Sequence, residues 1–404
     1  MEDALNQVRK FAAQGDHGRR EAVLALRDLL FSLETPHDTM HRYGHMVCFT
    51  PMTEQGRKLT IAQNLQAAIV QVGIDLKWFR YLAESSVPLT VDQISTKTGA
   101  EPQLTHRLLR FLASIGAVNE EGKDQYAANQ VTRNLTDKLV EAALSHYFGT
   151  AARQYQALPG YFKKNGYKDP VDDANCPFQV AHDTALSQYA WFAANPTQLA
   201  HFNTYMALRR KPDTTWLSVY PVAEHVANWS AEKSLFVNIG GGIGHQCAQF
   251  IDKFPKLPGR IVLQDLPQSV AQALPTPGVE NMAHDMFKPQ PVLGAKFYYL
   301  RGVLHNHPPH KVRLLLENIK SAMRPESILL VDEIVLPETQ VSYIAASLDL
   351  TMLSAFASME RTEAQWRETF ESVGLELVRT YTYYPQGYES VMDLRLPRTK
   401  PSSS

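Results

Sequence analysis

The feature that most constrains the fold is a change of pattern near residue 234, where short apolar runs begin to alternate with amphipathic segments. Short apolar runs bounded by polar residues predict strands, and apolar residues spaced three and four apart predict helices. Strands that alternate with helices form βαβ units, which place the strands side by side in a parallel sheet. We therefore predict an α/β fold, with strands at 235–239, 260–264, 278–283, 296–300 and 328–334.

Two further strands are predicted near the C-terminus, at 375–384 and 388–396, with only Pro385-Gln386-Gly387 between them. A connection this short joins antiparallel strands, because parallel strands need a long crossover. The predicted sheet is therefore mostly parallel, with an antiparallel hairpin formed by its last two strands.

The length of 404 residues is roughly two to three times that of a usual domain, so we expect two domains. The first half reads as helix, because apolar residues recur at helical spacing, as in Val8-Phe11-Ala12. We place a helical domain at 1–150 and the α/β domain at 151–404.

Residues 88–126 have the pattern of a winged helix-turn-helix. A first short helix is capped by Thr90, a second spans 102–114, and a β-wing follows around 118–126. DNA binding is one interpretation of this pattern. The second helix has a broad apolar face and few cations, which favours packing on a partner subunit. Those cations are His106, Arg107 and Arg110.

The charge and the cysteines limit the partners and the compartment. Lys plus Arg total 40 against 41 for Asp plus Glu, so no overall field favours nucleic acid or an anionic membrane. We find no targeting segment and no apolar run long enough for a membrane span. Because Cys48, Cys176 and Cys247 are widely separated and odd in number, we expect a reducing compartment and a cytoplasmic protein.

The first strand-to-helix turn, FVNIGGGIGHQ, is rich in glycine, as is required where a ligand approaches the backbone. Gly240, Gly242 and Gly244 match G-x-G-x-G, and His245 stands where a dinucleotide fingerprint would have glycine. Asp265 ends the next strand, where it is placed to accept both ribose hydroxyls of an adenosine.

A further acid, in His284-Asp285-Met286-Phe287, follows the third strand. Together with the glycine turn and the acid of the second strand, it predicts a nucleoside site. The alternative is a tight turn beside exposed acids.

A general base is predicted at the same edge of the sheet. Arg301 and His305 follow the fourth strand, Glu333 follows the fifth, and Glu360 lies in a later predicted helix that carries SMERTEAQW. Two carboxylates would orient the imidazole, raise its basicity and stabilise its imidazolium. A lone histidine is as often a packing residue, but the two acids favour the base.

The histidines of this segment could instead bind a metal. His305, His307 and His310 lie close together, but Pro308-Pro309 interrupts any helical face that would gather them. No cluster of further ligands is present nearby in the sequence, so we predict no metal site.

These motifs resemble the class I O-methyltransferases of plants and fungi, of the caffeate and flavonoid type, and most closely their fungal natural-product branch. The resemblance covers nearly everything from Leu33 to Leu396 and is carried by GGGIGH, LQDLP, HDMF, YLRGVLHNHP, DEIVLP and ERTEAQW. It implies a homodimer with an N-terminal winged-helix dimerisation domain and a Rossmann-like domain that binds S-adenosylmethionine. It also implies methyl transfer to a phenol or enol hydroxyl of a small secondary metabolite.

The resemblance further implies roles for single residues. His305 matches the catalytic base, and Glu333 and Glu360 match the acids that flank it. Other positions would contact the cofactor or line the substrate pocket. For the cofactor these are Gly240 and Gly242 along its length, Asp265 at the ribose, Asp285 and Met286 at the adenine and Arg301 near the carboxylate. For the substrate they are His146, Phe202, Asn203 and Met206.

Two positions depart from the family pattern. The acid of the first strand is Asn238, which removes a charge near the cofactor ammonium and should weaken binding by about 1–3 kcal/mol. The usual His-Asp-Trp is His305-Asn306-His307, which alters the polarisation of the site and the wall beside it.

These departures leave an alternative function open. Some members of the fungal branch keep S-adenosylmethionine but catalyse dehydration or pericyclic cyclisation of polyketide-derived, pyridone-type intermediates without methyl transfer. LETPHDTMHRYGHM and His146 in LSHYF resemble that subgroup, and also methyltransferases close to it. His305 with Glu333 and Glu360 favours methyl transfer, with the pericyclase or dehydratase as the alternative.

Overall fold

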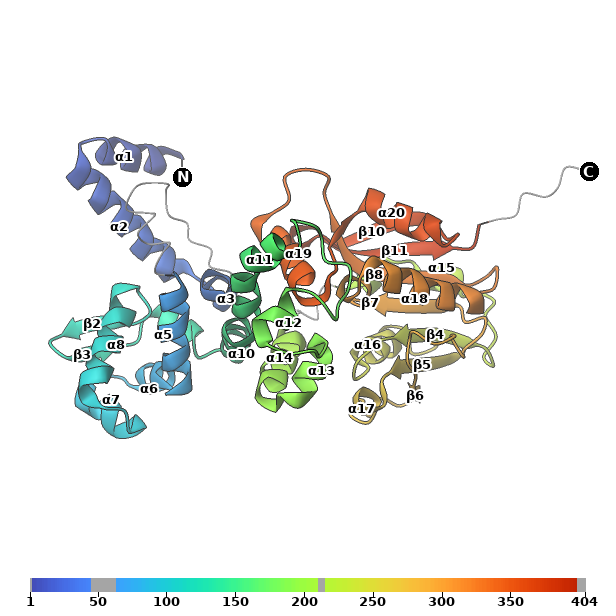
Figure 1. The fold of residues 1–404 in the computed structure, drawn as a ribbon, viewed down its shortest axis with the longest axis horizontal. Helices are drawn as coiled ribbons and strands as arrows, with labels where there is room; N and C mark the ends of the chain where they lie inside the picture. The colour runs from blue at the N-terminus through green and yellow to red at the C-terminus, as the bar shows by residue number, and fades with distance from the viewer. Residues whose placement is uncertain (1, 45–62, 210–214, 398–404) are drawn as a thin grey trace, which may run out of the picture. The chain divides into compact units, whose positions relative to one another are not determined.

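The computed structural model describes residues 2–44, 63–209 and 215–397 (Figure 1). Cys48 and the last two residues of LETPHDTMHRYGHM, which the sequence analysis used, lie outside these ranges. Within the described ranges, no helix combines the length and the apolar character that a membrane span requires. The chain divides into two compact units, which we describe separately.

Unit 1 comprises residues 1–153 and 192–210 and is mostly helical. Helix α7 begins after Thr90, whose hydroxyl accepts a hydrogen bond from the backbone N–H of Gln93, and it ends at Gly99 in the left-handed region. The helices α7 and α8 and the β2–β3 hairpin follow in the order expected for 88–126, and β1 adds a third strand to the hairpin. The elements are α1 (Glu2–Ala12), α2 (Asp16–Leu33), α3 (Pro36–Gly44), α5 (Gln63–Asp75), α6 (Trp78–Glu84), β1 (Leu89–Thr90), α7 (Val91–Thr98), α8 (Pro102–Ser114), β2 (Asn119–Gly122), β3 (Gln125–Ala127), α9 (Gln130–Asn134), α10 (Lys138–His146), the π-helix η1 (Tyr147–Ala151) and α14 (Pro196–Leu208).

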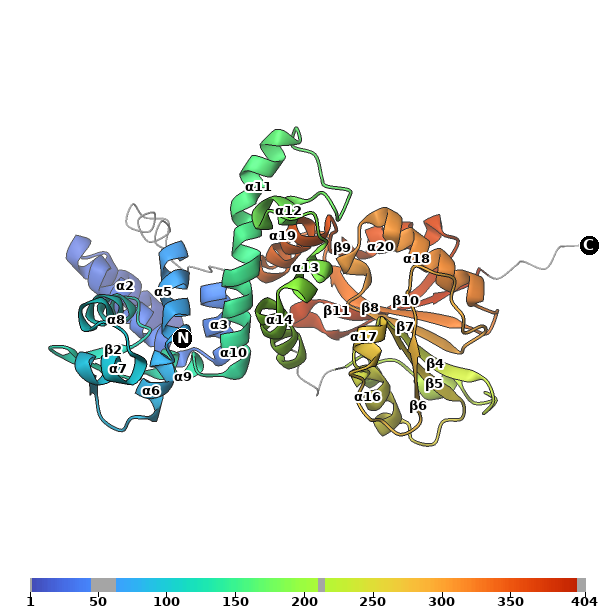
Figure 2. The same ribbon diagram turned by 60° about the horizontal axis from the view of Figure 1, so that its bottom comes forward.

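Unit 2 comprises residues 154–191 and 211–404 and contains the large sheet, in the order β10-β11-β8-β7-β4-β5-β6 with β9 beside β8 (Figure 2). The pairs among β4 to β8 are parallel, and β11 is antiparallel to both β8 and β10. The predicted α/β fold is confirmed, and each predicted strand lies within two residues of an observed one. The strands are β4 (Ser234–Ile239), β5 (Arg260–Asp265), β6 (Val279–Ala283), β7 (Phe297–Arg301), β8 (Ile328–Leu336), β9 (Arg361–Thr362), β10 (Glu376–Tyr384) and β11 (Glu389–Arg395).

Helices cover both faces of this sheet, so its strands are apolar on both sides. On one face Leu315 of α18 and Trp366 of α20 are fully buried, and on the other face Phe250 of α16 and Trp216 of η2 are fully buried. The helices of unit 2 are α12 (Pro177–His182), η2 (Trp216–Ser218), α15 (Val222–His225), α16 (His245–Lys253), α17 (Pro267–Val270), η3 (Leu304–Asn306), α18 (Pro309–Ala322), α19 (Tyr343–Phe356), α20 (Glu363–Ser372) and η4 (Pro385–Gly387), with α11 (Ala152–Lys164) and α13 (Gln188–Ala194) crossing the unit boundary.

The turn between β4 and α16 depends on glycine for two different reasons. Gly240 and Gly242 have φ of +64° and +60°, a region that side chains disfavour. At Gly241 the obstacle is space, because a Cβ there would lie 2.3 Å from Asn238 Nδ2 and 2.6 Å from Leu263 Cδ1. The sequence pattern does not single out Gly241, since the need for glycine there comes from residues packed beneath the turn.

We therefore expect Gly241→Ala to destabilise the protein by about 1–3 kcal/mol, the usual effect of overpacking a filled space. Gly160→Ala is the matched control, because Gly160 lies in α11 with nothing within 4 Å of its added Cβ. That control should leave stability unchanged or raise it by about 0.5–1 kcal/mol. Urea unfolding of both variants measures the difference, and a Gly241→Ala protein as stable as the parent would contradict this packing.

Candidate active site

The candidate site lies at the carboxyl ends of β4, β5, β7 and β8. Strand β4 has β5 on one side and β7 on the other, because the chain runs from β4 to β5 and β6 and then crosses back to β7. Open α/β sheets bind ligands outside the carboxyl ends of their strands at such a switch point. The glycine turn follows β4, Asp265 ends β5, and η3 follows β7.

Asp265 contacts the glycine turn directly. Its Oδ2 accepts a hydrogen bond from the backbone N–H of Gly242 at 2.8 Å, and its Oδ1 accepts one from that of Leu266 at 2.7 Å. The side chain is half-buried, which leaves part of the carboxylate accessible. The acid predicted to hold a ribose therefore lies beside the turn predicted to hold the same ligand.

Met286 lies beside the same glycine turn. A Cβ on Gly240 would lie 3.6 Å from Met286 Cε and 3.0 Å from Val303 Cγ2, so these side chains border the turn. The carboxylate of Asp285 accepts a hydrogen bond from the backbone N–H of Phe287 at 3.0 Å, which fixes the loop after β6. The structure thus brings Gly240 of the predicted turn together with Met286.

Asn238 lies beneath the glycine turn, on the side opposite to Met286 and Val303. Its side chain is buried under Gly241, on the face of the sheet that α16 covers. Burial raises the pKa of the neighbouring Cys247 thiol to about 12, and a hydrogen bond with Asn238 opposes this rise. Asn238 therefore supports the turn from below.

Arg301 is held by two acids. Its Nε lies 3.4 Å from Asp332 Oδ2, and its Nη2 lies 3.3 Å from Glu389 Oε2. Asp332 also accepts hydrogen bonds from the hydroxyls of Tyr299 at 2.5 Å and Tyr383 at 2.7 Å. Contact between Arg301 and a cofactor carboxylate stays a prediction, and these acids already offset its charge.

The second cluster lies around His305, which is buried in η3. His305 Nδ1 lies 2.8 Å from Glu360 Oε1 and 3.9 Å from Glu333 Oε2. Three side chains from different parts of the chain thus meet as expected. The helix predicted to carry Glu360 was wrong, because this residue lies in the loop between α19 and β9. An ionised carboxylate only accepts hydrogen bonds, so Nδ1 donates to Glu360 and leaves Nε2 as the acceptor of the neutral ring.

Glu333 also holds the backbone that carries the histidine. Its Oε1 accepts hydrogen bonds from the backbone N–H groups of Val303 at 2.9 Å and Leu304 at 2.7 Å. Burial raises the pKa of Glu333, while His305 and these two N–H groups oppose the rise. The sequence predicts only a contact of Glu333 with the imidazole, because motif spacing does not show which backbone groups a carboxylate meets.

Two further charged residues surround Glu360 and were missed from the sequence. Asp349 of α19 accepts a hydrogen bond from the backbone N–H of Glu360 at 2.8 Å. Arg361 is buried next to Glu360, with its guanidinium carbon 4.8 Å from the centroid of Trp366. The only available signal was an arginine adjacent to Glu360 in ERTEAQW.

The residues that depart from the family pattern lie beside His305. Asn306 Nδ2 donates to the backbone carbonyl of Gly302 at 2.9 Å, which stabilises the turn. The ring of His307 meets that of Phe287 edge-on at 5.0 Å, and burial lowers the pKa of His307 to about 4. The His307 side chain next to the candidate active site is therefore a neutral imidazole near neutral pH.

The predicted pocket residues lie in unit 1. His146 is buried against Phe202, with ring centroids 5.3 Å apart, and burial lowers its pKa to about 4. Asn203 is exposed and Met206 is half-buried, both on α14. Within its own unit, the structure therefore brings His146 and Phe202 together and leaves Asn203 at the surface.

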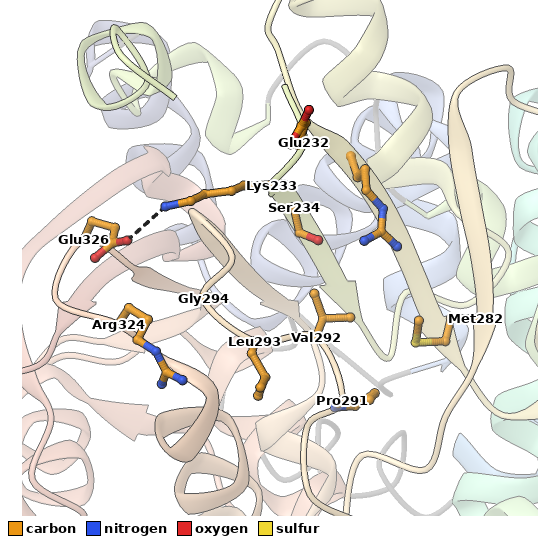
Figure 3. A pocket seen from close by; sticks show the side chains of 11 residues that line it. Glu232, Lys233, Ser234, Met282, Pro291, Val292, Leu293, Gly294, Arg324 and Glu326 are labelled. Carbon is orange, nitrogen blue, oxygen red and sulfur yellow. Dashed lines mark ion pairs between the residues drawn. The ribbon is translucent and has the colours of Figure 1, made fainter. Parts of the chain in front are cut away.

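A separate cavity of about 580 Å³ lies at the amino ends of β4 and β5 (Figure 3). Lys233, Ser234 and Arg260 line it together with the loop 291–294, and Lys233 Nζ lies 3.6 Å from Glu326 Oε1. None of the predicted site residues lines it, so this cavity is distinct from the candidate active site.

Comparison with known proteins shows the family of the chain. A family model described as the O-methyltransferase domain matches residues 165–376, and one described as the O-methyltransferase dimerisation domain matches 63–138. Demethylsterigmatocystin 6-O-methyltransferase of Aspergillus parasiticus is 40% identical over 93% of this chain and 92% of its own length.

Solved structures show the same fold. The structure of LepI in complex with SAM is 34% identical with a TM-score of 0.76, over 98% of each chain. A structure described as a pericyclic reaction enzyme is 34% identical with a TM-score of 0.75, over 98% of this chain and 99% of its own. With its α/β sheet, its glycine turn and the matched domains, the chain belongs to the O-methyltransferase family.

Proposed function

We propose that this protein transfers a methyl group to a phenol or enol hydroxyl of a secondary metabolite, with His305 as the general base. The observation that carries the proposal is the buried contact of 2.8 Å between His305 Nδ1 and Glu360 Oε1. It fixes the tautomer in which Nε2 accepts a proton. A relative named for methylating demethylsterigmatocystin at O-6 supports a small-molecule hydroxyl as the acceptor.

We propose S-adenosylmethionine as the cofactor, held by Gly240, Gly242, Asp265, Asp285 and Met286. Bound there, it would supply an electrophilic methyl group carried on a sulfonium sulfur. The three consecutive glycines of the turn and the acid beside them fit a nucleoside in close contact with the backbone. The structure of LepI with SAM supports the assignment. Arg301 completes the proposed set at the carboxylate end.

In this mechanism His305 Nε2 removes the proton of the acceptor hydroxyl as its oxygen attacks the methyl group. Glu360 holds the ring and stabilises the imidazolium, and Glu333 anchors the turn and adds a second negative charge. Both carboxylates are buried, where electrostatic interactions are stronger than in water.

The substrate pocket is proposed to include His146, Phe202, Asn203 and Met206. The ring of His146 is surrounded by aromatic rings, among them Phe202 and Tyr205. Such a wall suits a planar aromatic substrate. Its low pKa keeps His146 neutral near neutral pH, so it can hydrogen-bond a carbonyl or hydroxyl without adding a charge.

We also propose the domain arrangement and the assembly. Residues 1–150 would form a winged-helix dimerisation domain, and residues 151–404 the catalytic domain of a cytoplasmic homodimer. The family match at 63–138 supports dimerisation, and His106 Nδ1 lies 2.8 Å from Asp124 Oδ1, an acid that disfavours a phosphate beside this histidine. Small molecules, and neither nucleic acid nor membrane, are the proposed partners.

A second function is favoured by one comparison. The likeness to a pericyclic reaction enzyme supports a pericyclase or dehydratase that keeps the cofactor without methyl transfer. Asn306 in place of a family acid beside His305 agrees with a site released from methyl transfer. The intact contact between His305 and Glu360 favours the transferase.

Cofactor binding is tested by Asp265→Ala. Loss of charge-assisted hydrogen bonds to ribose hydroxyls should weaken binding of S-adenosylhomocysteine by about 2–4 kcal/mol, or roughly thirty- to a thousandfold. Isothermal calorimetry measures the affinity. Asp252→Ala is the control, since Asp252 is an exposed acid on α16. Equal affinity in the Asp265 variant, or no binding by the parent, would refute the assignment.

The general base is tested by His305→Ala. Turnover should fall about 10²- to 10⁴-fold with nearly unchanged S-adenosylhomocysteine affinity, because only proton removal is lost. Glu333→Gln and Glu360→Gln should reduce turnover less than His305→Ala does. His310→Ala changes an exposed residue and should retain the wild-type turnover. Initial rates use a phenolic acceptor chosen from a panel headed by demethylsterigmatocystin. Wild-type turnover by His305→Ala would remove the histidine from the mechanism.

The dimer is tested by light scattering, which should give about twice the chain mass of 45.5 kDa. Helix α2 exposes an apolar face that a partner would cover, with Leu29 55% and Leu33 70% exposed. The double variant Leu29→Glu, Leu33→Glu should therefore be a monomer, with the mass of one chain. Val378→Glu, at a residue 50% exposed on β10, should leave the dimer intact. A monomeric parent at micromolar concentration would contradict the assembly.

A further inference from the structure

Arg361 is a buried cation that the mechanism above does not use. Its side chain is 2% exposed, and Nη1 donates to the backbone carbonyl of Met359 at 3.3 Å. Strand β9 pairs with β8 so that Arg361 lies opposite Val335, two residues after Glu333. A buried guanidinium is retained only where nearby acids offset the loss of its hydration.

Two of the acids near Arg361, Glu333 and Glu360, are those that contact His305. Burial lowers the pKa of Arg361, and attraction to Glu333, Glu360 and Asp349 opposes this effect. Glu360 uses Oε1 for His305, and its buried Oε2 has no hydrogen-bond partner in the described part of the chain. The positive charge nearest in sequence to this oxygen is on the adjacent residue, Arg361.

We propose that Arg361 is a positioning residue that sets the basicity of His305 by offsetting the negative charge of Glu333 and Glu360. The inference rests on the proposed role of His305 as a base. A histidine beside two uncompensated carboxylates would hold its proton too strongly and would rarely be the free base at neutral pH. With Arg361 nearby, Glu333 and Glu360 still orient the imidazole ring, but the negative potential that they produce at His305 is smaller.

The cluster draws its charges from several elements. Glu333 comes from β8, Glu360 and Arg361 from the segment that enters β9, and Asp349 from α19. Asp169 lies near Asp349, and His307 near His305, as their electrostatic interactions show. The remaining charges around His307 are Lys311 of α18 and Asp173, which form an ion pair of 2.7 Å.

The direct test is the titration of His305 by NMR in protein labelled at histidine Cε1, without substrate. His305→Asn assigns its signal among the 14 histidines. Arg361→Gln should move the titration midpoint to higher pH by about one unit, since loss of a cation stabilises the imidazolium. Arg361→Lys keeps the charge and should keep the midpoint.

Two further variants separate this role from a structural one. Arg395→Gln removes another cation of the same unit, which pairs with Asp393 at 2.9 Å, and should leave the His305 midpoint unchanged. Asp349→Asn can still accept the hydrogen bond of Glu360, and it should move the midpoint to lower pH because an anion is lost. Should Arg361→Gln fail to fold, Arg361→Met, which also removes the charge, takes its place and should move the midpoint to higher pH in the same way.

The pH dependence of turnover provides the second readout. The acid limb of the profile of turnover against pH should move to higher pH in Arg361→Gln and to lower pH in Asp349→Asn, together with the NMR midpoints. Folded variants with the wild-type midpoint would overturn the role of Arg361. If the midpoints move but no methyl transfer occurs, the electrostatic role of Arg361 stands and the proposed transferase function fails.

Discussion

The candidate site depends on one buried carboxylate. Glu333, near the carboxyl end of β8, accepts hydrogen bonds from the backbone N–H groups of Val303 and Leu304 and lies 3.9 Å from His305 Nδ1. Without an acceptor, those buried N–H groups would each leave a hydrogen bond unmade, at a cost of about 1–3 kcal/mol. The Glu333 side chain therefore stabilises the turn after β7 and places a carboxylate next to His305.

The sheet explains how two polar clusters lie close together without merging. Successive side chains of a strand point to opposite faces, so Asp332 and Glu333 belong to different environments. Asp332 lies with Arg301 and two tyrosines on the face that α16 covers, and Glu333 lies with His305 on the other face. Each buried charge is therefore balanced on its own side of the sheet.

The sequence predicted the strands and the meeting of His305, Glu333 and Glu360, because apolar periodicity and the strand-end rule place them at one edge. It did not predict the support of Gly241 by Asn238 and Leu263, or the cluster of Asp349 and Arg361 around Glu360. These features depend on packing between segments distant in sequence, which no local pattern encodes. Likewise, no spacing rule indicated that Asp332 and Glu389 hold Arg301.

The central claim is that a methyl group moves to a hydroxyl that His305 deprotonates. The most direct test supplies S-adenosylmethionine with a trideuterated methyl group and determines the product mass with the phenolic acceptor. The account predicts a product that carries the labelled methyl group on oxygen, with one S-adenosylhomocysteine formed for each product molecule. A product with the substrate's mass, or lighter by one water, with the labelled cofactor unconsumed, would contradict it.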